Sequence, residues 1–244
     1  PASFEPTLDY VVTKVARFPF DKFSDASNKL GTQMKATGEV MSIGRTMEES
    51  LLKAMRSLET GVCHIYHKKF DDWTNDRLLE YIAEPTDDRL YAIAQLIRGG
   101  VDLVLIYNRT KIDMFFLEKF KNIVEFERVV EAAPMDIEVL REAKRMGFSD
   151  KFIGQLWGVS QHDMYLLREK NGIFPVYKMI DTCASEFSSY VPYFYSTYED
   201  ENESLVSDKE KIVVLGSGPI RIGQGVEFDY STVHAIWSCL LYTS

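Results

Sequence analysis

Apolar and polar positions alternate differently along the chain, and the changes divide it into three blocks. In residues 1–46, the run Tyr10–Val15 is rich in β-branched and aromatic residues, which predicts a strand. Gly31, Gly38 and Gly44 follow it, and we expect turns and loops there. The first block therefore predicts extended and irregular backbone without a helix.

Residues 46–176, here called the helical block, place apolar residues three and four positions apart, as amphipathic helices do. Thr46 and Glu49 have the spacing of a capping box, and Gly61 is expected to end the first helix. Its apolar residues at helical spacing are Leu51, Leu52, Met55 and Leu58.

Two longer helices are predicted next. Thr86 is expected to cap a helix that Gly99 and Gly100 end, and Thr110 to cap a long helix. The apolar residues of that long helix indicate burial on more than one side, at Phe115, Phe116, Phe120, Val124 and Val130. Residues 102–107 fit a strand or the start of a helix equally well.

Three short helices are predicted at about 137–146, 150–157 and 161–170. Each follows a residue that can cap a helix N-terminus and precedes a glycine that can end it. The caps are Asp136, Ser149 and Ser160, and the glycines are Gly147, Gly158 and Gly172.

The third block starts with an aromatic, β-prone run at Tyr190–Tyr198, followed by an acidic linker at 199–203. Lys211–Leu215 predicts a buried strand, and a glycine-rich loop follows at once, as at the start of a βαβ unit. Only 19 residues follow Gly225, so we expect this sheet to be begun and not finished. The predicted fold is mostly α, flanked by short α/β pieces.

Composition narrows the classes of function. The net charge of −9 argues against general affinity for nucleic acid, which needs an excess of Lys and Arg. No apolar run approaches the roughly 20 residues that span a bilayer, and the N-terminus lacks the pattern of a secretory signal. The three separated cysteines are typical of reduced thiols in an intracellular protein.

Three local motifs have an ordinary and a functional interpretation. The loop from Gly216 resembles a dinucleotide fingerprint, but Arg221 stands where a third glycine is expected. Cys63, His64 and His67 have metal-site spacing without an obvious fourth ligand, so a soluble loop with two histidines is favoured.

The third motif, residues 152–167, matches a DNA-binding helix-turn-helix. Its second helix has mixed charge on the face that would read bases, at His162, Asp163, Arg168, Glu169 and Lys170. A helix pair that only packs a core gives the same pattern. An acidic helix-turn-helix binding protein therefore remains the alternative function.

Longer motifs at both ends carry a more specific signal. The segment Gly216–Tyr230 resembles the opening of the second synthetase unit in the large subunit of carbamoyl phosphate synthetase. Three segments, residues 1–6, 9–14 and 34–45, resemble the end of the first ATP-grasp unit of that family. Residues 175–187 and 195–199 are also similar to members of the family.

The resemblance implies an internal fragment of a glutamine-dependent ligase that makes carbamoyl phosphate for pyrimidine and arginine biosynthesis from bicarbonate, ammonia and two ATP. Residues 1–46 would end the first unit, residues 47–206 would form a helical oligomerisation domain, and residues 207–244 would start the second unit. A chain cut from something longer also fits the missing initiator Met. From about Ser238 the sequence departs from the family pattern, which indicates a non-native tail.

The implied site is narrow. Arg221 and Glu227 match family positions that line the passage of carbamate to the second active site, beside a glycine loop at Gly216, Gly218, Gly223 and Gly225. The alternative is that Arg221 and Glu227 only brace this loop. No catalytic or metal-binding residue is assigned.

The resemblance also implies cofactors, partners and a location. The complete subunit would bind ATP with Mg or Mn and potassium, and the fragment would bind none of them. The expected partners are further copies of the chain, through the helical domain, and the glutaminase small subunit, with no nucleic acid and no membrane. The expected location is the cytoplasm.

Overall fold

The computed structural model describes residues 5, 7–20, 23, 25–35, 37–184, 186, 193–215 and 225–243, with backbone alone at 225–229, 242 and 243. The helices that it describes in the first part are α1 (Met47–Ser57), a 3-10 turn at Lys68–Phe70, α2 (Asn75–Tyr81), α3 (Arg89–Arg98), α4 (Leu103–Thr110) and α5 (Met114–Ala132). They are followed by α6 (Ile137–Arg145), α7 (Asp150–Trp157), α8 (Gln161–Lys170) and α9 (Gly225–Thr243). The strands are β1 (Val11–Arg17), β2 (Gly38–Gly44), β3 (Val176–Met179) and β4 (Phe194–Thr197).

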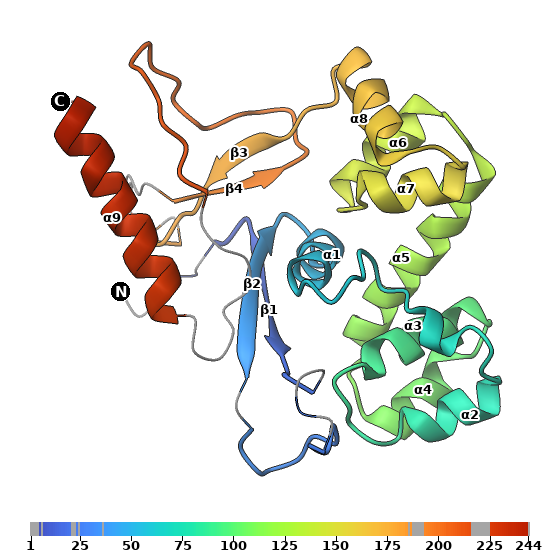
Figure 1. Ribbon diagram of the computed structural model, residues 1–244. Coiled ribbons are helices and arrows are strands. Elements are labelled where there is room, and N and C mark those ends of the chain that lie inside the picture. Colours follow the sequence, from blue (N-terminus) through green and yellow to red (C-terminus); the bar gives the residue numbers. More distant parts are fainter. Residues whose placement is uncertain are drawn as a thin grey trace.

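The helical block is built around α5, which contacts α1, α3, α4, α6 and α7. Figure 1 shows α1 between this group of helices and the β1–β2 hairpin, whereas the β3–β4 hairpin lies above it and α9 stands apart. The sheets of the described residues are two separate antiparallel hairpins, so the prediction of a mostly α fold with short α/β pieces is confirmed.

The first hairpin confirms one strand and corrects another expectation. β1 begins at Val11, within the predicted run, and pairs with β2 from Val11 opposite Gly44 to Arg17 opposite Gly38. Loops were expected around Gly38 and Gly44, because the sequence of residues 38–44 alone did not predict a strand. β2 pairs with β1, which lies more than twenty residues earlier in the chain, and this pairing satisfies the backbone hydrogen bonds of β2.

The start of α1 follows the predicted capping box with one change. Thr46 Oγ1 accepts a hydrogen bond from Glu49 N at 3.2 Å, as expected. Glu49 Oε2, however, accepts from Arg45 N at 2.7 Å. The helix ends at Ser57, and Glu59 and Gly61 then take the left-handed conformation of the turn. The four predicted apolar positions of this helix are buried.

The predicted caps at Thr86 and Thr110 are wrong, because aspartates nearer to each helix take the position. Asp88 precedes α3, and Thr86 donates its hydroxyl to Asp88 Oδ1 at 3.0 Å. Asp113 caps α5 by accepting from Phe115 N at 2.9 Å. Thr110 instead ends α4, where its hydroxyl donates to the Ile106 carbonyl at 2.8 Å. Residues 103–110 are therefore helical, which resolves the ambiguous run.

The three short helices α6, α7 and α8 are confirmed with their caps. Asp136, Ser149 and Ser160 each accept from an amide of the first turn, and Ser160 forms a complete capping box with Asp163. The three predicted glycines have φ of 90°, 69° and 64° at Gly147, Gly158 and Gly172, where only glycine is unstrained. Local signals were sufficient here.

The predicted strand at Lys211–Leu215 is not formed. These residues belong to no described strand, and Val213 and Leu215 are 80% and 87% exposed. A strand of this buried type requires neighbouring strands for its backbone and covering helices for its side chains. Among the described residues, no strand pairs with this segment and no helix covers it, so the apolar run stays exposed.

Candidate functional site

The predicted glycine loop and carbamate-passage residues are mostly outside the described residues. These outside residues are Arg221, Gly216, Gly218 and Gly223. Gly225 is the first residue of α9, and Glu227 lies in its first turn with only its backbone described. The role assigned to Arg221 and Glu227 by resemblance therefore stays a prediction.

A buried network joins His64 to α3 and α5. His64 Nε2 lies 2.9 Å from Glu127 Oε1, and Arg98 donates to both oxygens of Glu127 at 2.7 and 2.6 Å. The imidazole is stacked on the Phe152 ring with 3.7 Å between centroids. This network anchors the loop after α1 to the centre of the helical block.

The charges in this network are set by burial and pairing. Burial lowers the pKa of His64, so the imidazole is neutral and donates from Nε2. Burial would raise the pKa of Glu127, but hydrogen bonds from Arg98 and His64 outweigh it and the pKa of this carboxyl is lowered. Glu127 is thus the anion that holds both partners.

The expectation of a soluble loop with two histidines is wrong for His64, which is 1% exposed. His67 does lie in the loop, where its Nδ1 accepts from Lys69 N and caps the 3-10 turn. Within the described ranges, no cluster of three His, Cys, Asp or Glu side chains is arranged to hold a metal ion. His64 therefore has a role in packing, and His67 has a role in capping the 3-10 turn.

A second buried network links α6, α7 and α8. Asp150 accepts from Lys144 Nζ at 2.8 Å and from Arg168 Nε and Nη2 at 2.9 and 2.7 Å. Arg168 also donates to the carbonyl of Ile173, and Lys144 to that of Phe148. Burial lowers the pKa of Lys144 to about 8 despite the attraction of Asp150. Both cations face the ring of Tyr198, at 5.0 and 5.6 Å.

This network removes the basis for the helix-turn-helix interpretation. Arg168 would have been a base-reading or phosphate-binding residue of the second helix, but it is 7% exposed and held by Asp150. His162 and Asp163 are exposed, and the hydroxyl of Ser160 binds the Asp163 carboxylate. The helix pair packs a core, and no observation supports the alternative function of a DNA-binding protein.

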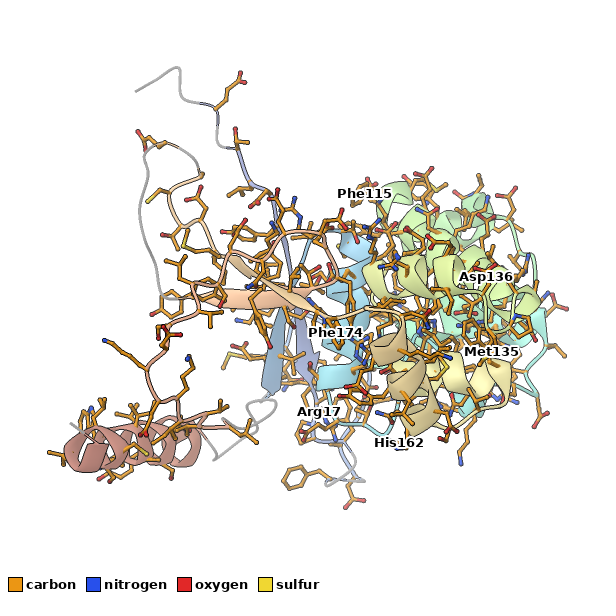
Figure 2. The ribbon with its side chains drawn as sticks, turned by 90° about the horizontal axis from the view of Figure 1, so that it is seen from above. Arg17, Phe115, Met135, Asp136, His162 and Phe174 are labelled. Atoms are coloured by element: carbon orange, nitrogen blue, oxygen red, sulfur yellow. The ribbon has the colours of Figure 1, made fainter. Side chains whose placement is uncertain are left out.

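Large apolar side chains remain exposed where α4 meets the start of α5. Val104 and Leu105 are each 52% exposed, Phe115 51% and Phe116 43%. The rings of Phe115 and Phe116 are in edge contact, 5.3 Å apart. Figure 2 places Phe115 at the outer edge of the helical block. Large exposed apolar patches are typical of interaction sites.

Phe115 also lies at one end of a groove of about 680 Å³ along α5. The α5 side chains that line it include Lys119, Asn122, Glu125 and Val129. Met47 of α1 and Met146, which follows α6, line it as well. Sequence reasoning predicted the apolar breadth of this helix but missed its polar residues. Their signal was the seven-residue spacing of positions 115, 122 and 129, which is typical of a helix that packs against another helix.

No helix among those described combines the length and apolar composition needed to cross a bilayer.

Comparison with protein families gives two matches. Residues 39–172 match the oligomerisation domain of the carbamoyl-phosphate synthetase large chain, and residues 208–240 match the carbamoyl phosphate synthase preATP-grasp domain. The first match contains β2 from its second residue and all the helices from α1 to α8.

The first match covers more than half of the 244 residues, and the second follows it in the order that the resemblance predicts. The two matches thus agree with the residues that carry the resemblance. The chain belongs to the carbamoyl-phosphate synthetase large chain family, whose enzymes are ligases.

Proposed function

We propose that the chain serves as the oligomerisation and inter-domain scaffolding part of a carbamoyl phosphate synthetase large subunit, and that it is inactive on its own. The single observation that carries this proposal is the match of residues 39–172 to the oligomerisation domain. The exposed apolar residues at α4 and α5 lie inside that range and supply a surface that association can cover.

In the complete enzyme, the proposed partners are further copies of the chain and a glutaminase small subunit that releases ammonia. ATP, Mg or Mn and potassium would bind to other parts of the large subunit. The proposed boundaries are those of the three segments 1–46, 47–206 and 207–244. The proposed location is the cytoplasm, and the product carbamoyl phosphate would serve pyrimidine and arginine biosynthesis.

Arg221 and Glu227 are proposed to line the passage of carbamate. A guanidinium can hold a carbamate anion through two parallel hydrogen bonds, and Glu227 can orient that guanidinium. In an assembled enzyme, Arg221→Ala should lower carbamoyl phosphate synthesis more than bicarbonate-dependent ATP hydrolysis. Equal loss of both activities would favour the bracing role for this residue.

Self-association is tested on the chain itself. Light scattering with size exclusion at roughly 50 μM should detect a dimer or a higher oligomer, since specific interfaces hold at micromolar concentration or better. A monomeric mass at that concentration would refute the helical block as a self-sufficient oligomerisation unit. Repeating the measurement on residues 5–206 separates this association from contacts made by residues 207–244.

Inactivity is tested by measuring ADP release with and without bicarbonate. We expect no bicarbonate-dependent release, because residues 39–172 match an oligomerisation domain and residues 208–240 a preATP-grasp domain, and neither of these is the ATP-grasp core itself. Bicarbonate-stimulated turnover that persists through repeated purification would contradict the proposal.

A further inference from the structure

The outer face of α5 has the same pattern in both directions from Asn122. Phe115 stands seven residues before it and Val129 seven residues after it, so that an apolar side chain lies at each end. Lys119 and Glu125 stand three residues before and after it and carry opposite charges. A helix face with this arrangement is complementary to itself when it is turned end over end.

These five positions share one face, and that face is open. Phe115, Asn122, Glu125 and Val129 are exposed, and Lys119 is partly exposed. All five line the same groove along α5. From residue 115 to residue 129 the helix runs for roughly 21 Å, which is the length of an ordinary helix contact. The face is therefore long enough and accessible enough to receive a second helix.

In an antiparallel helix pair with its two-fold axis at Asn122, each residue faces the one at the same distance beyond the axis. Phe115 would face the partner's Val129, and Lys119 would face the partner's Glu125. The two Asn122 amides would meet at the axis, where each can donate and accept a hydrogen bond. In a parallel pair, Lys119 would instead face the partner's Lys119, and like charges would meet.

We propose that two copies of the chain associate through α5, packed antiparallel with the two-fold axis at Asn122. This proposal rests on the proposed function, because it names the surface by which the helical block self-associates. Such a contact is isologous, so the same patch serves both copies and every contact occurs twice.

Contacts within the chain prepare this face. Asn122 Nδ2 donates to Glu48 Oε1 at 2.9 Å, and Lys119 Nζ lies 3.3 Å from the same oxygen. Both side chains are thereby fixed against Glu48 of α1 before association, which lowers the loss of rotamer freedom. Apolar residues of the groove walls, Met47 and Met146, widen the contact beyond the helix itself.

Charge reversal tests the register directly. Lys119→Glu places two glutamates opposite each other at both ends of the axis, and Glu125→Lys places two lysines there. Each single variant should weaken the dimer by about 10- to 30-fold in Kd, since two exposed attractive contacts become repulsive. The measurement is analytical ultracentrifugation of the whole chain at low salt, where surface electrostatics are least screened.

Mixing the two variants gives the decisive result. A heterodimer of Lys119→Glu with Glu125→Lys places a glutamate opposite a lysine at both contacts. The mixture should recover the Kd of the unsubstituted chain to within about threefold, and a tag on one variant should capture the other. Because neither variant regains its own charge, recovery cannot come from repaired folding.

Glu118→Lys is the matched control. Glu118 is an exposed residue of the same helix, and it does not line the groove. Its reversal should change Kd by less than about threefold. Circular dichroism should give the same helicity for all variants.

The outcomes separate the two proposals. An oligomer that ignores both single reversals would overturn the α5 contact and leave self-association of the helical block intact. Weakening without recovery in the mixture would overturn the antiparallel register. A monomeric unsubstituted chain would overturn the proposed function itself, and with it this inference.

Discussion

The helical block has its apolar residues buried, whereas residues 204–215 and 230–241 leave similar apolar residues exposed. Leu117, Ile123 and Val130 of α5 are completely buried. Leu215, Val213 and Leu241 are 87%, 80% and 78% exposed. In both views α9 stands apart from the helical block (Figures 1 and 2).

The difference shows what each kind of segment needs from its surroundings. A helix satisfies its backbone within itself, so α5 only needed apolar neighbours, which α1, α3, α4, α6 and α7 provide. The run 211–215 needed other strands before its side chains could be buried. Apolar sequence is therefore sufficient for burial only where the rest of the chain completes the layer.

Hydrogen exchange should show the largest contrast between the two regions. Amides at the centre of α5, such as those of Ile123 and Val124, should open only with global unfolding, at about 5 kcal/mol or more. Amides of Ile212 and Val213 should exchange at nearly the unprotected rate. Mass spectrometry of peptic peptides measures both, and strong protection of 211–215 in a monomer would contradict this comparison.

Asp150→Ala should be the most damaging single substitution in the helical block. It leaves Lys144 and Arg168 buried without their carboxylate, and loss of one partner of a buried pair costs about 3–5 kcal/mol. Urea unfolding measures this loss. The matched control is Asp200→Ala, whose carboxylate is 86% exposed beside Arg145 and should contribute less than about 1 kcal/mol.

Leu117→Ala and Leu215→Ala make the same chemical change in the two regions. The first opens a cavity in the buried core and should cost about 2–5 kcal/mol of unfolding free energy. The second removes a side chain that is already in solvent and should cost less than about 0.5 kcal/mol. Equal losses in denaturant titrations would mean that residues 211–215 pack against the helical block in solution.

Acid should weaken the helical block through His64. Its pKa in the folded chain is below the ordinary 6.5, so the unfolded chain binds more protons between these two values. The stabilisation by neutral His64 is complete above about pH 6.5 and is lost as the pH falls below it, by at most about 1.4 kcal/mol per pH unit. Glu127 acts in the same direction below its ordinary pKa of 4.5.

Urea midpoints between pH 7.5 and 5.5 measure this loss. His64→Gln should flatten the pH dependence, whereas replacement of the exposed His162 by Gln should leave it as steep as before. A slope that is unchanged by His64→Gln would place the titrating group elsewhere.

Predictability from sequence followed the range of the interaction. Asp136, Ser149 and Ser160 were identified because a cap and its amides lie within four residues. Thr86 and Thr110 were wrong because Asp88 and Asp113 compete for the same turns. β2 was missed because it forms by pairing with β1, and the local sequence of residues 38–44 does not indicate that long-range pairing.

The site was harder to predict than the fold. The Asp150 network joins residues 6 and 18 positions apart, and the contact of His64 with Glu127 spans 63 positions. Composition cannot tell whether such residues are buried. The spacing along α5 could be read directly, but its meaning depends on which residues of that helix the other helices leave exposed.

The hairpin at the start of the chain has a consequence for where the protein can be divided. Ser50 of α1 donates to Thr13 Oγ1 at 2.8 Å, and Ser42 donates to the Ser50 carbonyl. Separating the hairpin from α1 at Thr46 would remove Thr13 and Ser42 from Ser50. It would also expose to water a face of α1 that the hairpin now covers. If the helical block is exchanged between two relatives, the recombination point that preserves the contacts of α1 therefore lies before β1. The β1–β2 hairpin should be transferred together with the helices.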